Sequence, residues 1–254
     1  MNTLSRKERI SLNLNEDREV SVKGSIAPIE YTQFNHHVEW DALANLQVAE
    51  PEWQYSASIF QAFLPPESVL VGECWQIEKD GVLELLRQLN PKPNLDININ
   101  NGDSLGLWAC LRAYNDEFAD IVFRIHAEFV IEGGRFTPSQ FAGHLVIDRI
   151  KEEIIFFQMY VPNGTLNFDA YWDTVGSELG YCPQMELCTG TLPDHVEFTT
   201  SITQEEAERA LILCFYNSVQ ISWVSLEAAL ELAPAQQKPI HVVLLDGPLF
   251  DESC

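Results

Sequence analysis

Two groups of residues have types and spacings that could support chemistry. Cys254 follows the short segment Asp246–Ser253, which itself follows the apolar run Ile240–Leu245. A cysteine placed after a central strand, at the start of a helix, has a lowered pKa, because exposed amide groups and the helix dipole stabilise its thiolate. A thiolate is the nucleophile in thiol–disulfide exchange. Cys254 is therefore the candidate nucleophile, with Ser253 beside it.

The second group lies in the middle of the chain. Arg124, His126 and Glu128 alternate with apolar residues along the predicted strand Ala119–Ile131, so that they share one face of it. Three such side chains could form an acid–base cluster. A polar sheet face with no catalytic role has the same pattern, so the alternation alone leaves both interpretations open.

Metal-binding patterns are weak. Asp96-x-Asn98-x-Asn100 begins like a calcium loop, but Asn101 and Leu107 stand where that loop requires Gly and a bidentate Glu. The six cysteines include no Cys-x-x-Cys pair, which argues against a disulfide framework or a zinc site. We expect the first five to be buried, reduced thiols. These five are Cys74, Cys110, Cys182, Cys188 and Cys214.

The elements that must position these residues indicate an α+β protein. A short helix over Val82–Leu89 ends at Asn90-Pro91. Asn101-Gly102 predicts a hairpin turn, and Thr137-Pro138 predicts a brief helical turn. Residues 106–114 are predicted as the return strand of this hairpin, and two further strands are predicted at about 143–149 and 153–161, joined around Arg149–Glu152. The middle of the chain is therefore expected to form a mainly antiparallel sheet.

The pattern changes in the last third of the chain. Thr203–Glu206 is a capping box that begins a helix. Val219–Trp223 predicts a strand, Ser225 caps a helix that runs to about residue 233, and Ile240–Leu245 predicts a buried strand. This order makes a βαβ unit, the first half of a thioredoxin-like domain. We thus predict a polar N-terminal segment (1–50), an α+β sheet domain (51–200) and an incomplete thioredoxin-like domain (201–254).

Composition excludes several classes of partner. The chain has 254 residues, of which 38 are acidic and 15 basic, giving a net charge of −23. Such a field repels nucleic acid and anionic membranes. The N-terminus lacks the pattern of a signal peptide, and the apolar runs are too short to span a bilayer. We therefore expect a soluble, cytoplasmic protein.

From about Trp53 to the end, the sequence contains a series of distinctive runs. They are Phe63–Pro66, Phe123–Phe129, Phe136–His144, Val161–Asn163, Leu166–Asp169, Gly180–Leu187 and Asp251–Cys254. Several of these runs are long and they occur in the same order as in the selenoprotein N family, which the sequence therefore resembles over this region.

The resemblance implies a redox-active thiol/selenol–disulfide oxidoreductase whose thioredoxin-like domain carries the motif Ser-Cys-Sec-Gly. Ser253 and Cys254 match its first two positions. We expect selenocysteine to follow Cys254, the chain being truncated where its UGA codon is read as a stop. The selenolate would attack a disulfide or peroxide, and Cys254 would resolve the intermediate. No separate cofactor is expected, and the truncated chain should be inactive or impaired.

The resemblance also implies supporting residues and partners. We expect a polar network of Arg124, His126, Glu128, His144, Gln184 and Glu186, in which the 124–128 face packs against the 180–188 region. The substrate would be a protein or small-molecule disulfide or peroxide, and a homodimer is an allowed assembly. Vertebrate members carry a membrane anchor and an EF-hand, and neither pattern is present here, so the chain looks like a prokaryotic member.

Two other classes of function remain open at this point. The chain could be a non-catalytic module whose sheet binds a partner protein. It could instead be an acidic protein that binds a metal such as calcium.

Overall fold

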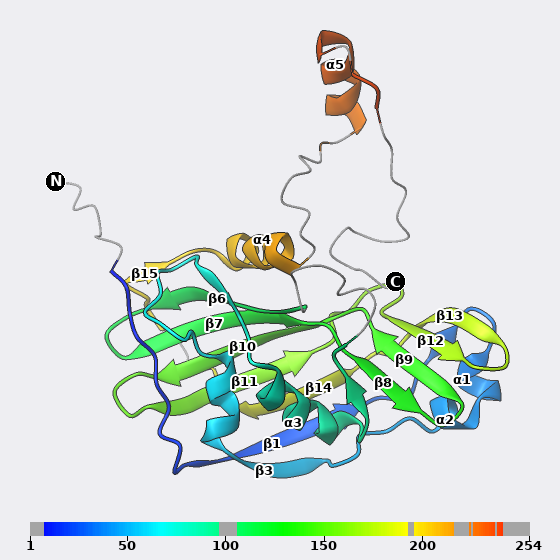
Figure 1. Cartoon of the computed structure of the whole chain (residues 1–254), viewed down its shortest axis with the longest axis horizontal. Coiled ribbons are helices and arrows are strands. Elements are labelled where there is room, and N and C mark those ends of the chain that lie inside the picture. The colour runs from blue at the N-terminus through cyan, green and yellow to red at the C-terminus, as the bar shows by residue number, and fades with distance from the viewer. Residues whose placement is uncertain are drawn as a thin grey trace.

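The computed structural model describes residues 8–96, 106–192, 196–215, 224, 226–236 and 238–240. This part of the chain is mainly β-structure with a few helices, and all its paired strands are antiparallel (Figure 1). The predicted α+β class with a mainly antiparallel sheet is confirmed. Several predicted features lie outside the described residues. They are the turn at Asn101-Gly102, the strand Val219–Trp223, residues 241–245 of the next strand, Ser253 and Cys254.

The larger sheet has nine strands in the order β15-β6-β7-β10-β11-β14-β1-β3, with β4 also paired to β6. The bounds are β1 Glu19–Ile26, β3 Glu52–Ser56, β4 Cys74–Gln76, β6 Leu107–Tyr114, β7 Phe118–Ile125, β10 Phe141–Asp148, β11 Glu153–Tyr160, β14 Met185–Gly190 and β15 Thr200–Ser201. Strands β6, β10 and β11 confirm those predicted at 106–114, 143–149 and 153–161.

The smaller sheet has six strands in the order β2-β13-β12-β9-β8-β5. The bounds are β2 Tyr31–Thr32, β5 Pro93–Asn94, β8 Glu128–Ile131, β9 Gly134–Pro138, β12 Phe168–Trp172 and β13 Gly176–Tyr181.

Two predictions about this region are wrong. The single strand Ala119–Ile131 is in fact two strands, β7 and β8, which belong to different sheets. Ala127 and Phe129 stay buried across the break, so the alternation gives no sign of it. Thr137-Pro138 ends strand β9 rather than opening a helical turn. Strand β9 is stabilised by Phe136, whose buried ring stacks on Phe129 with 5.1 Å between centroids.

The main core lies on the face of the large sheet that η1 (Ala57–Phe63) and α3 (Lys79–Leu89) cover. Phe123 is buried there, with its ring centroid 4.8 Å from Phe63 and 5.7 Å from Phe157. Gly143 pairs with Phe123 on the neighbouring strand, and a Cβ atom at Gly143 would lie 2.1 Å from the ring. The glycine therefore leaves room for the phenylalanine. Helix α3 also confirms the helix predicted at 82–89.

The opposite face of the same sheet carries α4 (Gln204–Phe215), seen above β6 and β7 in Figure 1. Its buried residues Ala207 and Leu211 form a small separate cluster with two residues of the sheet. The predicted capping box is present. The Glu206 amide donates to Thr203 Oγ1 at 3.1 Å, and the Glu206 carboxylate accepts from the Thr203 amide at 2.8 Å. This cap fixes where α4 begins above the sheet.

Residues 8–50 contribute one strand to each sheet, β1 to the larger and β2 to the smaller. Strand β1 lies between β14 and β3, and Ile10, Leu12 and Leu14 are buried. Two short helices, α1 (His36–Glu39) and α2 (Asp41–Ala44), follow. The remaining helix, α5 (Leu226–Gln236), includes Pro234 and so extends past the end predicted near residue 233.

Candidate functional site

Several residues of the expected polar network lie on the face of the large sheet that α4 covers. The strand register places Arg124 of β7 opposite Ala142 of β10. Ala142 in turn lies opposite Tyr160 of β11, which lies opposite Glu186 of β14. Since side chains alternate between faces, His144 lies on this same face, one row away. The chain therefore brings Arg124, His144 and Glu186 from three strands onto one surface.

A cavity of about 580 Å³ lies between this surface and α4. Arg124, Tyr160 and Gln140, which precedes β10, line it from the sheet side. Helix α4 contributes Glu205, Glu208, Arg209, Leu211 and Ile212, and the loop after β11 contributes Pro162 and Asn163. The cavity thus offers two guanidinium groups, two carboxylates, two amides and a phenol on a partly apolar lining.

Arg124 is the most deeply buried charged group of this cavity. Arg124 is only 7% exposed to solvent. Its guanidinium donates a hydrogen bond to the side-chain amide oxygen of Gln140, which is also buried. His126, 4% exposed, follows at the end of β7. Burial, and then the positive charge of Arg124, lower the pKa of His126 to about 4. At neutral pH the imidazole of His126 is therefore uncharged, and of these two side chains only Arg124 carries a positive charge.

Tyr160 and α4 define the other side of the cavity. Burial, together with the nearby Glu208 carboxylate, raises the pKa of Tyr160. Its hydroxyl therefore remains protonated at neutral pH and can donate a hydrogen bond. The arrangement can bind and orient a small polar ligand or a peptide segment that carries both acidic and basic groups. Among the described residues, no cysteine lines this cavity.

His144 connects the sheet to the first turn of α4. Its Nε2 lies 3.1 Å from Oε1 of Gln204, and its Nδ1 lies 3.8 Å from Oδ1 of Asp120. Asp120 is also paired with Arg112, whose Nε donates at 2.9 Å. His144 therefore helps to hold the helix over the cavity.

Gln184 and Glu186 line an adjacent hollow of about 400 Å³, which shares Tyr160 and Asn163 with the first cavity. Gln184 Nε2 donates to Glu186 Oε1 at 2.6 Å, and Gln158 Nε2 donates to Glu186 Oε2 at 3.3 Å. The 180–188 region is thus a neighbour of the Arg124 cavity and forms its own polar group.

Glu128 belongs to another part of the molecule. It lies in β8 of the smaller sheet, where it pairs with Arg135 at 2.9 Å and accepts from Asn94 at 3.2 Å. Arg124, His126 and Glu128 therefore do not share one strand face. The change of sheet after Ile125 separates Glu128 from the other two.

The expectation of five buried cysteines holds for two of them. Cys110 and Cys182 are buried, whereas Cys74, Cys188 and Cys214 are partly exposed. Burial raises the pKa of Cys182 to about 11, and it also raises the pKa of Cys188. Neither is therefore a reactive thiolate at neutral pH. Cys254 and Ser253, the candidate catalytic residues, lie outside the described residues.

Several lining residues of the cavity were missed in the sequence. Gln140 and Asn163 lie within runs that resemble the family, which was an available signal. Tyr160, Glu208 and Arg209 had none, because their role depends on strand register and on where α4 docks. A larger hollow of about 780 Å³ lies beside β3 and α3, but it contains none of the predicted site residues.

Two further searches cover only the described part of the chain. There, no group of three or more His, Cys, Asp or Glu side chains could hold a metal ion. No helix within the same residues has the length and hydrophobicity needed to cross a bilayer.

Known proteins resemble the chain in sequence. Selenoprotein N of Danio rerio is 29% identical over 265 residues, which covers 79% of the chain. Human selenoprotein N is 28% identical and mouse selenoprotein N 27% identical, each over 270 residues and 81% of the chain. The chain spans 45% to 48% of these relatives, or about half their length. Neither a family model nor a solved structure matches it. The similarity to all three relatives supports a selenoprotein N-like family for this chain.

Proposed function

We propose that the protein is a thiol/selenol–disulfide oxidoreductase in which Cys254 is a redox thiol. The observation that carries this proposal is the similarity to selenoprotein N over 79% to 81% of the chain. The run Asp251–Cys254 adds support, because it resembles the start of the Ser-Cys-Sec-Gly motif of that family. In that motif a selenocysteine stands directly after the cysteine.

In this mechanism Cys254 resolves the covalent intermediate. Attack of a selenolate on a substrate disulfide forms a mixed selenenylsulfide and releases one substrate thiol. The Cys254 thiolate then attacks the selenium, releases the second thiol and leaves a bond between the adjacent residues. A reductant of the thiol class restores the pair by the reverse exchange. Two electrons pass to the substrate in each cycle.

The cavity under α4 supports a role in substrate binding. Arg124 and protonated Tyr160 can donate hydrogen bonds to carboxylate or carbonyl groups, and Glu208 can accept from an ammonium group. Peptides and small peptide-like thiols carry all these groups. We therefore assign the cavity the binding step, and Cys254 the chemical step.

Thiol kinetics on the native 254-residue chain test the role of Cys254. Mixing with an excess of an aromatic disulfide should give one fast-reacting thiol, and Cys254→Ser should remove that phase. Cys188→Ser is the matched control and should retain it, because Cys188 is only partly exposed and has a raised pKa.

Two results would contradict the assignment. A fast phase that persists in Cys254→Ser would mean that another cysteine is the reactive thiol. Sustained turnover of a model disulfide by the 254-residue chain that is lost in Cys254→Ser would mean that Cys254 needs no partner after it, because a single thiol can form a mixed disulfide but cannot resolve it.

A further inference from the structure

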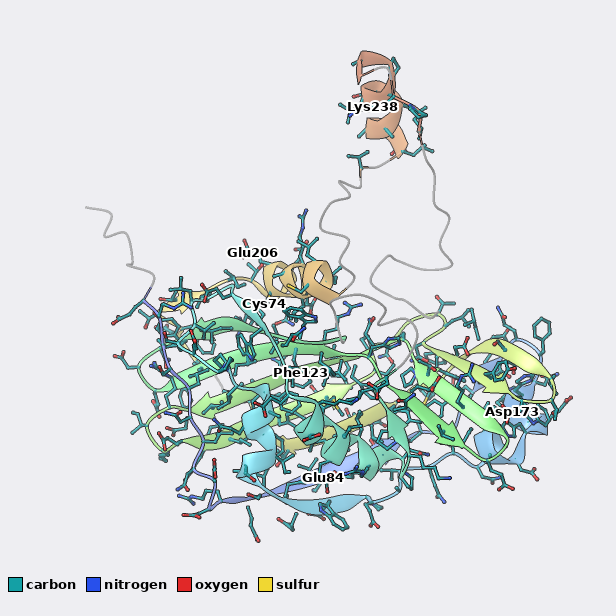
Figure 2. The ribbon with its side chains drawn as sticks, in the orientation of Figure 1. Cys74, Glu84, Phe123, Asp173, Glu206 and Lys238 are labelled. Carbon is teal, nitrogen blue, oxygen red and sulfur yellow. The ribbon has the colours of Figure 1, made fainter. Side chains whose placement is uncertain are left out.

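Three cysteines that are distant in the sequence meet where α4 rests on the large sheet. Cys74 lies in β4, Cys110 in β6 and Cys214 in α4. Figure 2 shows Cys74 next to α4. Cys74 packs against the small cluster that contains Cys110. Helix α4 contacts β4, and Cys214 lies three residues after Leu211, on the face of α4 that meets the sheet. Cys74 is therefore the common neighbour of the other two.

The backbone positions of Cys74 and Cys110 suit a disulfide. The two residues are directly opposite in the antiparallel pair β4–β6. The Ile77 amide, three residues after Cys74, donates at 3.1 Å to the carbonyl of Leu107, three residues before Cys110. Hydrogen-bonded pairs recur at every second position, so Cys74 and Cys110 form a non-hydrogen-bonded pair. Such pairs have Cα atoms about 4.5 Å apart, within the range of roughly 4.4 to 6.8 Å that disulfides span.

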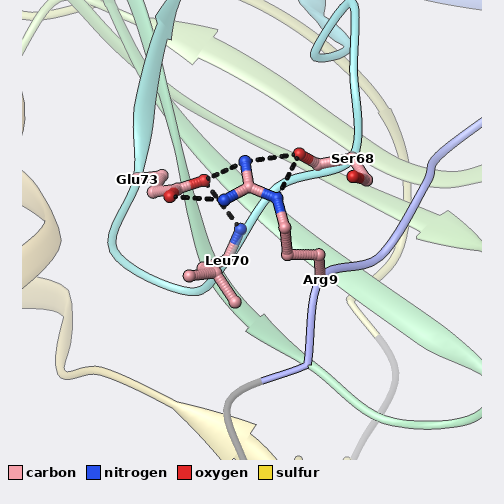
Figure 3. A network of polar contacts seen from close by, with 4 residues as sticks. All are labelled: Arg9, Ser68, Leu70 and Glu73. Carbon is pink, nitrogen blue, oxygen red and sulfur yellow. Dashed lines mark hydrogen bonds and ion pairs between the residues drawn. The ribbon is translucent and has the colours of Figure 1, made fainter.

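Of these three thiols, Cys74 has a route to the surface that Cys110 lacks. Cys110 is 0% exposed, whereas Cys74 lines a surface hollow of about 310 Å³. Arg9 also lines this hollow, and Figure 3 shows the polar contacts that hold its side chain. Its guanidinium pairs with the Glu73 carboxylate at 2.8 and 2.9 Å and donates to the Ser68 carbonyl at 2.7 and 3.0 Å. An external reagent therefore meets Cys74 before Cys110.

We propose that Cys74, Cys110 and Cys214 form a second redox site, in which Cys74 is shared by two mutually exclusive disulfides. The oxidant is a small-molecule disulfide of the glutathione type. The Cys74 thiolate attacks it, forms a mixed disulfide and releases one small thiol. Cys110 or Cys214 then attacks the Cys74 sulfur and displaces the second small thiol. Two electrons pass to the oxidant, and the two cysteine protons end on the released thiols.

The choice of partner has a mechanical consequence. A Cys74–Cys110 bond lies within the sheet and leaves α4 held by non-covalent contacts such as those of Ala207 and Leu211. A Cys74–Cys214 bond ties α4 to the sheet and so fixes the roof of the cavity described above. Attack by the free third thiol exchanges one bond for the other without net electron transfer.

The surroundings of Cys74 also determine how fast this site is oxidised. Hydrogen bonding to Cys110, more than burial, raises the pKa of Cys74 to about 12. Little thiolate is therefore present at neutral pH, and oxidation should be slow beside that of an accessible low-pKa thiol. This separates the site from Cys254 in kinetic terms.

The experiment is a disulfide map of the full chain after prolonged incubation with oxidised glutathione. Free thiols are alkylated, and the unreduced protein is digested and analysed by mass spectrometry. We expect loss of two hydrogens and peptides that join Cys74 to Cys110 or Cys214. The same crosslinks should form in Cys254→Ser, which distinguishes this proposal from the proposed function. Crosslinks that exclude Cys74, or a stable glutathione adduct at Cys74 with no crosslink, would overturn it.

Single variants identify the two bonds. Cys110→Ala should yield only Cys74–Cys214, and Cys214→Ala should yield only Cys74–Cys110. Cys188→Ala is the matched control and should yield both, since it lies on the same sheet but outside the trio. Circular dichroism verifies the fold of each variant. If Cys110→Ala fails to fold, the map of the wild-type chain and of Cys214→Ala still decides: absence of any Cys74 crosslink in both contradicts the proposal.

Discussion

The neutral His126 beside Arg124 should make the stability of the protein depend on mildly acidic pH. The folded state holds the pKa of His126 near 4, chiefly because the imidazole is buried, against 6.5 for an unperturbed histidine. Between these values the unfolded chain binds a proton that the folded chain does not. Stability contributed by this group is therefore complete above about pH 6.5 and is lost as the pH falls toward 4.

The size of the effect follows from the two pKa values. The difference is 6.5 − 4, or about 2.5 pH units, and each unit corresponds to about 1.4 kcal/mol. The full loss of unfolding free energy is then about 3 kcal/mol, of which roughly 2 to 3 kcal/mol is reached by pH 4.5. A domain with a typical total stability of about 5 to 15 kcal/mol would show this loss clearly.

Urea unfolding at pH 7.5 and pH 4.5 measures this loss directly. His126→Gln removes the titrating group, so the variant should lose about 2 to 3 kcal/mol less than the wild-type chain between these pH values. Comparing the two losses cancels any constant cost of the substitution and the titration of other groups. His144→Gln is the control from the same sheet, and it should keep the wild-type loss because it leaves His126 in place. Equal losses in the wild-type chain and His126→Gln would refute the reasoning.

Two further predictions concern the fold around the cavity. Phe123→Ala should lower the free energy of unfolding by about 3 to 5 kcal/mol, because it empties the space between Phe63 and Phe157. The control is Phe34→Ala, at a position that is 70% exposed, which should change the free energy of unfolding by about 0.5 kcal/mol or less. Urea unfolding distinguishes these outcomes, and equal effects would contradict the assigned packing. Thr203→Ala removes the N-terminal cap of α4, at a cost of about 1 kcal/mol. Amide hydrogen exchange should therefore accelerate in α4 and stay unchanged in α3. Equal acceleration in both helices would contradict the prediction that the cap stabilises α4 alone.

Local signals account for the elements that the sequence predicted well. Strands β6, β10 and β11 are short runs rich in apolar and aromatic residues, and α4 begins at a capping box that needs only Thr203 and Glu206. The break between β7 and β8 could not be found in this way, because Ala127 and Phe129 continue the alternation of β7 into a different sheet. Alternation reports which face is buried, but it does not report which sheet buries it.

The candidate site was predictable only where a matching family run marked a residue. Arg124 and Glu186 were found in such runs, and the strand register then placed them on one surface. Arg209 and the cysteine trio depend instead on the docking of α4 against β4 and β6, between segments far apart in the chain. No spacing within the sequence encodes that contact. The sequence likewise gives no sign that Glu128 is separate from Arg124 and His126. Only the change of sheet after Ile125 separates them.

The place of β1 in the large sheet has a consequence for folding. Its neighbours are β3, which follows it closely, and β14, which the ribosome makes only after most of the sheet strands. The β1–β3 pair must therefore wait, with one edge unpaired, until β14 emerges. Closing contacts between such distant segments slows folding, and open strand edges pair readily with other chains. We therefore expect the docking of β1 onto β14 to be a late step, and the nascent chain to be most prone to aggregation before that step.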